Sequence, residues 1–373
     1  MVPTFLILIS ASFLWALPAQ NTTTLKLVHV FFRHGSRTPE EKDIYPNDPY
    51  KVGTFMPMGY GHLTNSGKQR AYKLGKMFRR RYNDFLGEIY TPDVLLARST
   101  DFDRTKITAL LVLAGLYPPA PSQKWDEHVN WLPIPYDFEK DQRDYFIRRP
   151  TSYCPNYVKE FDRVMASSEV QRILKDNSKT FQYLTRNTGK SISKLSHAFS
   201  LYQTLNAEDY MGLDLPRWTE SVYPETLHYL SGKLCNFENY NSILKRLNGG
   251  RILKKVIENM VAKANNTLKP ENRKLFLFSG HENNVINMLA AMNLFQPHVP
   301  KYSSAVIIEL HYLEDEDNHV VKVLYSRTVD AEPEEQAVPG CGEKCYLEKF
   351  VEVTAANVPD NYTQECNSPF NLD

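Results

Sequence analysis

Short apolar segments, each followed by a helical pattern, constrain the fold of this chain most strongly. Residues 25–32 (LKLVHVFF) and 274–278 (KLFLF) are almost continuously apolar, as in strands that are buried on both faces of a sheet. Further strands are expected at 93–98, 305–310 and 319–324. Helical spacing of apolar residues lies between them, for example over 64–85. Strands that alternate with helices predict an α/β protein with an open, mostly parallel sheet flanked by helices.

The chain is long enough for about two domains. It has 373 residues, and residues 138–247 carry helical patterns with little strand character. Asn248-Gly249-Gly250 reads as a break, after which helical spacing resumes. We therefore predict that residues 20–137 and 248–373 form the α/β core, and that 138–247 form an inserted, mainly helical smaller domain.

The N-terminus predicts a cleaved signal peptide over residues 1–19. This stretch has no charged side chain, and its apolar run of about 15 residues is shorter than the roughly 20 that a membrane span needs. An uncleaved N-terminal anchor is the alternative. No second apolar run approaches spanning length, so we expect no membrane span in the mature chain. These features predict a secreted protein of the secretory pathway, with the lysosome as the alternative destination.

Cysteines and sequons agree with that compartment. The chain has five cysteines, which leaves one thiol over if the others pair, and Cys341 and Cys345 could close a small loop. A zinc ribbon would need a second close pair, which the sequence lacks. Asn21, Asn265 and Asn361 each begin an Asn-x-Thr sequon and are predicted glycosylation sites.

The charge balance argues against a nucleic-acid partner. Lys and Arg total 44 and Asp and Glu total 43, which leaves a net charge of +1. Nucleic-acid binding through bulk charge requires a clear excess of basic residues. We therefore expect no nucleic-acid partner.

A candidate nucleophile and phosphate-binding side chains directly follow the first strand, in the run Arg33-His34-Gly35-Ser36-Arg37-Thr38-Pro39. The planar guanidinium of arginine matches phosphate oxygens two at a time. A neutral His34 imidazole is a nucleophile at neutral and mildly acidic pH. Gly35 allows a ligand or another backbone segment to approach closely. Because ligands of open α/β sheets bind beyond the carboxyl ends of strands, this segment is a candidate site.

Two other strands end in residues that could join that site. His281 and Glu282 follow the strand at 274–278, and Glu282 could protonate a departing oxygen. Arg98 ends the second strand, at the edge of the sheet where Arg33 and Arg37 are expected. Phosphoryl transfer needs mainly positioning and positive charge around three oxygens, so three arginines could supply it without a metal ion or another cofactor.

Other motifs indicate other chemistry and fit less well. His281-Glu282 opens the HExxH pattern of zinc proteases, but position 285 is valine. Asp101-Phe102-Asp103-Arg104-Thr105 fits the DxDx[TV] pattern of magnesium-dependent haloacid-dehalogenase phosphatases, with Asp101 as the nucleophile. That motif normally follows the end of a strand directly, whereas Arg98-Ser99-Thr100 intervene here. The dipole of a following helix is sufficient to explain acidic residues in its first turn. A catalytically weak or inactive secreted binding protein on the same scaffold is the other alternative.

Three blocks of the chain resemble a known family. LVHVFFRHGSRTP, LLARSTDFDRT and LFLFSGHENN resemble, in this order, the catalytic blocks of histidine acid phosphatases, which belong to the phosphoglycerate-mutase-like superfamily. The likeness runs from about residue 25 to 366 and is greatest to the insect secreted or venom members. It implies that phosphate monoesters are hydrolysed through a phosphohistidine on His34. It also implies that Arg33, Arg37 and Arg98 clamp the phosphoryl oxygens, and that His281 joins them.

The resemblance has further implications. The proton donor of the family is usually Asp, whereas this chain has Glu282, which is one methylene longer and slightly less acidic, with a reference pKa of about 4.3 against about 3.9. We therefore expect the reach of the donor to differ. A homodimer is also implied. The implied disulfides are Cys154–Cys366 and Cys341–Cys345, which leaves Cys235 as a free thiol.

Overall fold

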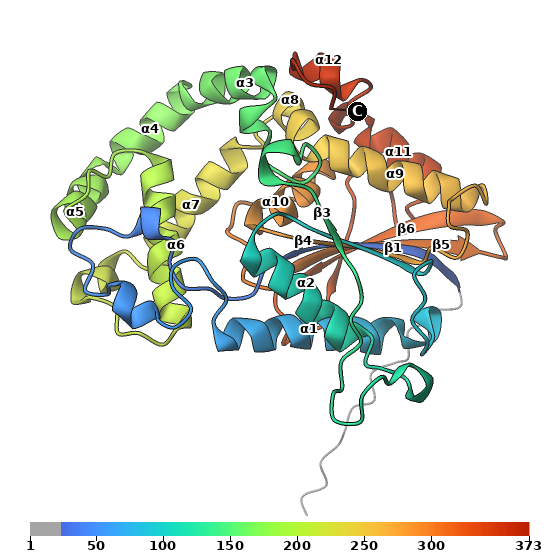
Figure 1. The fold of residues 1–373 in the computed structure, drawn as a ribbon. Coiled ribbons are helices and arrows are strands. Elements are labelled where there is room, and N and C mark those ends of the chain that lie inside the picture. The colour runs from blue at the N-terminus through green and yellow to red at the C-terminus, as the bar shows by residue number, and fades with distance from the viewer. Residues whose placement is uncertain (1–23, 373) are drawn as a thin grey trace, which may run out of the picture.

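A seven-stranded sheet lies at the centre of the protein (Figure 1). The computed structural model describes residues 24–372. The strands are β1 (Leu25–Arg33), β2 (Leu95–Ser99), β3 (Asp137–Phe138), β4 (Leu275–Gly280), β5 (Ala305–Leu313), β6 (Asn318–Ser326) and β7 (Glu334–Gln336). Their order is β3-β2-β4-β1-β5-β6-β7, with parallel pairs from β3 to β1 and antiparallel pairs from β1 to β7. Only β5 and β7 of the described strands run against the others, which confirms the predicted mostly parallel sheet.

Helices cover both faces of this sheet (Figure 1). One face carries α1 (Asn65–Leu86) and α2 (Asp103–Leu116), and the other carries α9 (Arg251–Ala264), α10 (Glu282–Ala291) and α11 (Leu347–Thr354). Successive side chains of a strand point to opposite faces, so Val30 of β1 packs in the core beneath α1 and α2, whereas Phe31 packs in the core beneath α9 and α10. Because both faces are buried, β1 is apolar along nearly its whole length.

The middle of the chain forms a group of helices beside one end of the sheet, at the left of Figure 1. These helices are α3 (Pro155–Met165), α4 (Ser168–Asp176), α5 (Ser178–Thr188), α6 (Leu195–Tyr210), α7 (Glu225–Phe237) and α8 (Ser242–Lys245). Their apolar faces build a separate core, to which Leu184, Leu201 and Leu230 contribute. This part of the chain is therefore mainly helical, and we call it the helical unit.

The predicted break at residues 248–250 is wrong. The chain continues from α8 through a π-helical segment, Arg246–Gly250, into α9 without leaving helical geometry. The glycines instead allow backbone segments to approach one another. A Cβ on Gly249 would lie 2.2 Å from the carbonyl oxygen of Asn287, and one on Gly250 would lie 2.0 Å from that of Asn357. A glycine pair in sequence does not distinguish such close packing from a loop.

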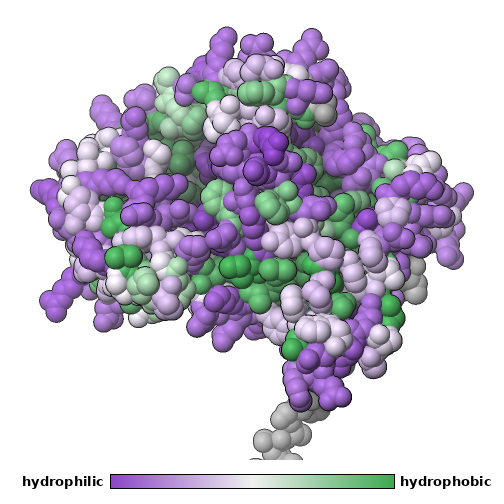
Figure 2. Space-filling view, viewed as in Figure 1, coloured by the Kyte–Doolittle hydropathy of each residue, from purple (hydrophilic) through white to green (hydrophobic). Residues whose placement is uncertain are grey.

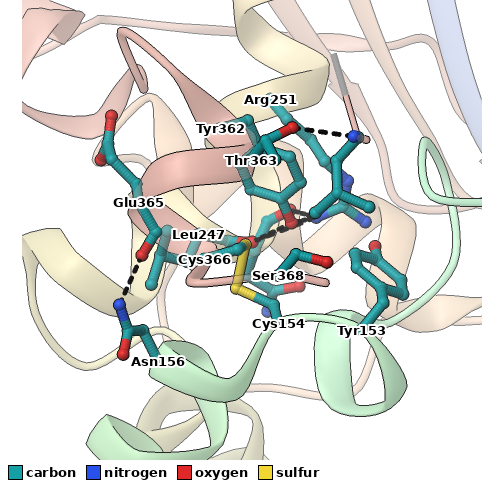
Figure 3. Close-up of a disulfide and its surroundings, with 12 residues drawn as sticks. Tyr153, Cys154, Asn156, Leu247, Arg251, Tyr362, Thr363, Glu365, Cys366 and Ser368 are labelled. Carbon is teal, nitrogen blue, oxygen red and sulfur yellow. Dashed lines mark hydrogen bonds between the residues drawn. A yellow bond between two sulfur atoms is a disulfide. The ribbon is translucent and has the colours of Figure 1, made fainter. Parts of the chain in front are cut away.

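The two disulfides implied by the resemblance are present. Cys154–Cys366 joins the start of α3 to α12 (Tyr362–Cys366) and so ties the helical unit to the C-terminal region (Figure 3). Beside it, the Tyr362 hydroxyl donates to the Leu247 carbonyl at 2.7 Å and accepts from Arg251 Nη1 at 2.9 Å. The second disulfide is Cys341–Cys345, and Cys235 on α7 is a buried free thiol.

Close backbone packing fixes the loop that follows β1. A Cβ on Gly35 would lie 2.2 Å from the Gly67 carbonyl oxygen, and one on Gly67 would lie 2.0 Å from the Ser36 carbonyl oxygen. Thr64 caps α1, because its Oγ1 accepts the Gly67 N–H at 3.0 Å while its own N–H donates to Ser36 at 3.0 Å. The contact leaves no room for a side chain on either glycine, so the start of α1 holds this loop in place.

The face of the molecule in Figure 2 is largely hydrophilic, with hydrophobic residues in scattered patches. Two of the predicted glycosylation sites, Asn265 and Asn361, are exposed. The third, Asn21, and the predicted signal peptide at 1–19 lie outside the described residues. No helix between residues 24 and 372 is long and apolar enough to cross a membrane.

Candidate active site

Three segments that are distant in sequence meet at the carboxyl edge of the sheet. β1 and β4 pair in parallel with Arg33 beside Gly280, and the His34 N–H donates to the Gly280 carbonyl at 2.9 Å. β2 lies on the other side of β4, and the Thr100 N–H donates to the Ser279 carbonyl at 3.1 Å. Backbone pairing therefore brings together the ends of all three strands.

A cavity of about 440 Å³ opens at this edge. Of the six residues predicted for the site, His34, Arg37, His281 and Glu282 line it. Arg33 does not line the cavity itself, but its Nε lies 3.4 Å from Glu282 Oε2. The helical unit supplies one wall of the cavity through Phe161, Ser196, Phe199, Ser200, Gln203, Leu234 and Glu238.

His34 is held as a neutral imidazole in one tautomer. Its Nδ1 lies 2.8 Å from the carbonyl oxygen of Gly35, which can only accept, so Nδ1 carries the proton and Nε2 is left with a free lone pair. The side chain is buried, and burial together with the charges of Arg104 and Arg33 holds its pKa well below the usual 6.5. His34 therefore keeps a free imidazole lone pair at mildly acidic pH, as a nucleophile would require.

His281 lies edge-on to His34, with 5.5 Å between the ring centroids. Its Nε2 is 3.0 Å from the Thr100 hydroxyl, and its backbone N–H donates to Asn284 Oδ1 at 2.9 Å at the start of α10. Burial and the charge of Arg104 lower the pKa of His281 well below 6.5, although Glu282 opposes this shift. Two neutral imidazoles thus lie side by side in the cavity.

Three arginines surround these imidazoles, each fixed by a contact of its own. Arg33 Nη1 donates to the Pro300 carbonyl at 2.5 Å, Nη2 donates to Gln203 Oε1 at 3.1 Å, and the guanidinium lies 4.1 Å from the centroid of the Tyr302 ring. Arg37 Nη1 donates to the Thr38 carbonyl at 2.9 Å. Arg104 Nη2 pairs with Glu40 Oε1 at 3.0 Å.

This arrangement favours an anion. Burial and the neighbouring Arg37 lower the pKa of Arg104 to about 10, which shows that the cations repel one another in a poorly solvated place. The Nε atoms of all three arginines are buried and have no hydrogen-bond partner among the described residues. A phosphoryl group would supply both the negative charge and the acceptors.

Glu282 begins α10 and enters the cavity as a carboxylate. Burial raises its pKa, but Arg33, His281 and Arg149 outweigh burial and lower it to about 2. Arg149 Nη2 lies 4.0 Å from Oε1, on the other side of the carboxylate from Arg33. In the free protein Glu282 therefore holds no proton above strongly acidic pH.

Arg98 does not join the cluster. It lies within β2 rather than beyond its end, and it pairs with the buried Asp144 at 2.8 Å next to a different cavity of about 470 Å³. Arg104, in the first turn of α2, lies where Arg98 was expected from the sequence. Both arginines belong to the block LLARSTDFDRT, and the start of the helix after β2 points its residues at the carboxyl edge, which is the signal that would have identified Arg104.

The sequence analysis also missed Arg148 and Arg149, which line the cavity from the segment between β3 and α3. Arg148 pairs with Asp141 through its Nη2, at 3.0 Å from Oδ2. Arg149 pairs with Glu238, at the C-terminal end of α7, at 2.8 Å. Two consecutive arginines before a proline carry no signal that distinguishes a cavity wall from a solvated loop.

Asp101, the nucleophile of the magnesium-dependent alternative, does not line the cavity. Its carboxylate pairs with Lys106 of α2 and accepts the Asp141 N–H at 3.3 Å. Between residues 24 and 372 there is no cluster of three or more His, Cys, Asp or Glu side chains that could hold a metal ion.

Comparison with known proteins agrees with this geometry. The family model of the histidine phosphatase superfamily (branch 2) matches residues 24–326. Venom acid phosphatase Acph-1 of Apis mellifera is 40% identical over 348 residues, which cover 93% of this chain and 88% of that protein. Lysosomal acid phosphatase of Homo sapiens is 31% identical over 357 residues, covering 94% and 82% of the two chains.

Among solved structures, Hafnia alvei phytase in complex with myo-inositol hexakis sulphate has a similar fold, with a TM-score of 0.69. It is 16% identical, and the match covers 92% of this chain and 98% of the phytase. The matched family model and the two relatives identify the family of this chain, and the phytase shows the same fold. The chain therefore belongs to the histidine phosphatase superfamily, branch 2, and is an enzyme of the phosphatase class.

Proposed function

We propose that this protein is an acid phosphatase that hydrolyses phosphate monoesters through a phosphohistidine on His34. The observation that carries the proposal is a histidine with a defined free Nε2 among three buried arginines whose Nε atoms make no hydrogen bond to a described residue, although Arg33 Nε lies 3.4 Å from Glu282 Oε2. A histidine nucleophile and a phosphate clamp are the two parts that this reaction requires.

In the first step, Arg33, Arg37 and Arg104 bind the three non-bridging oxygens of the phosphoryl group. Gln203, Pro300 and Glu40 hold two of these arginines in place, so little side-chain freedom is lost on binding. His34 Nε2 attacks phosphorus in line with the ester oxygen, the P–O bond breaks, and the N–P bond forms. The arginines stabilise the charge that develops on the equatorial oxygens.

Glu282 is the proposed proton donor for the departing alkoxide. Its pKa of about 2 in the free protein results from cations that a bound phosphoryl group would itself neutralise. The negative charge of the substrate therefore raises the pKa of Glu282, and a proton enters with the substrate. Acidic pH favours this uptake. In the second step water attacks phosphorus, the Glu282 carboxylate accepts its proton, the P–N bond breaks with its electron pair returning to His34 Nε2, and inorganic phosphate leaves.

The test is to identify the intermediate. We would mix the purified protein with radiolabelled phosphate monoester, quench within milliseconds into alkaline denaturant, in which phosphohistidine is stable, and map the label by peptide analysis. The expected label is on His34, and H34A should show neither label nor turnover. Rapid turnover without label on His34 would refute the proposal.

The same preparation separates the alternatives. An inactive binding scaffold predicts phosphate binding without turnover of p-nitrophenyl phosphate. A magnesium-dependent enzyme predicts loss of activity in EDTA and in D101N. We expect activity that persists in EDTA and in D101N, because Asp101 pairs with Lys106 away from the cavity lining.

We further propose that the protein is exported through the secretory pathway, to the extracellular space or the lysosome. The disulfides and the exposed Asn265 and Asn361 support this proposal, as do the venom and lysosomal relatives. Secretion from insect cells, with a glycosidase-sensitive mass shift lost in N265Q/N361Q, would test it. Unglycosylated protein retained in the cytosol would contradict it.

A homodimer is a separate proposal about the sheet edge. β3 has no strand on its outer side within the described chain, its Phe138 is exposed, and Trp125 and Trp131 are exposed in the segment that precedes it in the sequence. An open strand edge with exposed aromatic rings favours association with a second copy. Light scattering should give a dimer for the wild type and a monomer for W131E; a monomeric wild type would contradict the proposal.

A further inference from the structure

We propose that Arg149, held by Glu238, is a positioning residue that sets the orientation and the proton affinity of the donor Glu282. The inference rests on the proposed function. Glu238 belongs to the helical unit and Arg149 to the segment before it. Neither residue lies at the three strand ends that meet at the candidate site.

The first observation is how Glu282 is held. Its two carboxylate oxygens face different guanidinium groups, with Oε2 3.4 Å from Arg33 Nε and Oε1 4.0 Å from Arg149 Nη2. No hydrogen bond from another side chain reaches the carboxylate within residues 24–372. The position of this side chain is therefore controlled by charge rather than by fixed hydrogen bonds.

The second observation is that Arg149 has a partner of its own. Its Nη1 lies 2.8 Å from Glu238 Oε1, and Glu238 is 9% exposed. The Glu238 carbonyl in turn accepts the Tyr157 hydroxyl at 3.1 Å, which links the end of α7 to α3. Glu238 therefore anchors Arg149, and the free edge of its guanidinium is left for Glu282.

These contacts assign different tasks to the two arginines. Arg33 is expected to turn its Nε toward a bound phosphoryl group, which releases Oε2 of Glu282. Arg149 already binds one carboxylate and stays beside Oε1. The oxygen that is released can then take the proton and face the leaving group, while the other oxygen remains held. This restraint matters because Glu has one more rotatable bond than Asp.

The charges around Glu282 fix the direction of each effect. The charged or titratable groups that face it are Arg33, Arg37, Arg104, Arg149, His281, Glu238 and Cys235. Arg149 favours the carboxylate form, so its removal should raise the pKa of Glu282. Glu282 raises the pKa of Glu238, and because repulsion between like charges is mutual, removal of the Glu238 charge should lower the pKa of Glu282.

The experiment uses four variants and two substrates. R149M removes the cation, R149K keeps it, and E238Q removes the charge of the residue that anchors it. The double variant R149M/E238Q replaces R149M if that protein folds poorly, because it does not leave the buried Glu238 carboxylate without its partner. The substrates are glycerol phosphate, whose alkoxide needs a proton, and p-nitrophenyl phosphate, whose phenolate does not. R143M is the matched control, because Arg143 comes from the same segment but pairs with Glu139 on the surface.

We expect R149M to reduce kcat for glycerol phosphate about tenfold, and to change kcat for p-nitrophenyl phosphate less than about threefold. The alkaline limb of the kcat profile should move up by about one pH unit in R149M and down in E238Q. R149K should restore most of the kcat. The inhibition constant of inorganic phosphate should stay within about twofold of the wild type in R149M, as in R143M.

Three results would overturn the inference. An equal loss on both substrates would show a general structural role, and so would pH shifts of the same sign in R149M and E238Q. A large rise in the inhibition constant of inorganic phosphate in R149M would make Arg149 part of the clamp instead. A wild type without turnover refutes the proposed function, and this inference with it, whereas an active wild type with equal losses refutes this inference alone.

Discussion

At the scale of single residues, the donor carboxylate has the most testable role. In the proposed mechanism Glu282 protonates the leaving group in the first step and accepts a proton from water in the second, so E282Q should act most strongly on substrates with a basic leaving group. We expect kcat to fall about 100-fold or more for glycerol phosphate and less than about tenfold for p-nitrophenyl phosphate, measured by steady-state kinetics. Equal losses on the two substrates would remove Glu282 from the donor role.

Arg104 and Arg98 provide a second, paired prediction. Arg104 lines the cavity and its Nε has no partner among the described residues, whereas Arg98 pairs with Asp144 beside another cavity. R104M should lower kcat/KM by about 100-fold or more and weaken inhibition by inorganic phosphate. R98M should leave kcat/KM within about threefold but lower Tm, because Asp144 becomes a buried, unpaired carboxylate. The opposite ranking would restore Arg98 to the clamp.

The sequence was sufficient to predict most of the residues that lie together at the candidate site. One group of these residues lies at the end of β1 and the other follows β4. Because β1 and β4 pair in parallel, their ends meet at the same edge of the sheet, and this pairing alone brings together His34, Arg33, Arg37, His281 and Glu282. The choice between Arg98 and Arg104 depends on where β2 ends and α2 begins, and sequence patterns locate such boundaries only to within a few residues. Arg149 and Glu238 were missed because their contact joins segments that no local pattern relates.

At the scale of elements, the two disulfides should stabilise the folded protein by different amounts. Cys154 and Cys366 are separated by 212 residues, against 4 for Cys341 and Cys345. On the chain-entropy account, the long cross-link stabilises by about 5 kcal/mol and the short one by about 2 kcal/mol. C154A/C366A should therefore lower Tm more than C341A/C345A in thermal unfolding. The reverse order would show that the link between α3 and α12 adds little.

Element types were predictable, and one connection was not. The strands at 25–32, 93–98 and 274–278 lie within two residues of β1, β2 and β4, because buried strands have a distinctive composition. Asn248–Gly250 was misread because glycine serves both loops and close helix packing. Only the carbonyl groups of Asn287 and Asn357, which are distant in sequence, show that packing is the reason here.

At the scale of the whole molecule, a buried pair of acids links folding to pH. Glu208 of α6 is 0% exposed and Asp48, in the loop between β1 and α1, is 2% exposed, and the two carboxyl groups share a hydrogen bond. Burial and the nearby Asp48 raise the pKa of Glu208 from its ordinary 4.5, so the folded protein holds a proton that the unfolded chain would release. The stability that this group contributes is complete below pH 4.5 and is lost as pH rises through the raised pKa.

We therefore expect the Tm of the wild type to fall relative to that of E208Q between pH 5 and pH 8, because the amide has no proton to lose. The measurement is differential scanning calorimetry of both proteins over that range. The comparison with E208Q cancels the effects of buried histidines such as His34, which act in the opposite direction. Parallel curves for the two proteins would show that Glu208 does not titrate on unfolding.

The placement of the cavity between a hydrogen-bonded sheet edge and a wall of helices has an evolutionary consequence. His34 and His281 directly follow β1 and β4, so their spacing is set by the sheet, whereas Phe161, Phe199 and Leu234 belong to helices outside the sheet. Substitutions in this wall can then change the shape of the cavity while the spacing of His34 and His281 is kept. The fold that this chain shares with Hafnia alvei phytase at 16% identity shows that such a sheet can be kept while most side chains change.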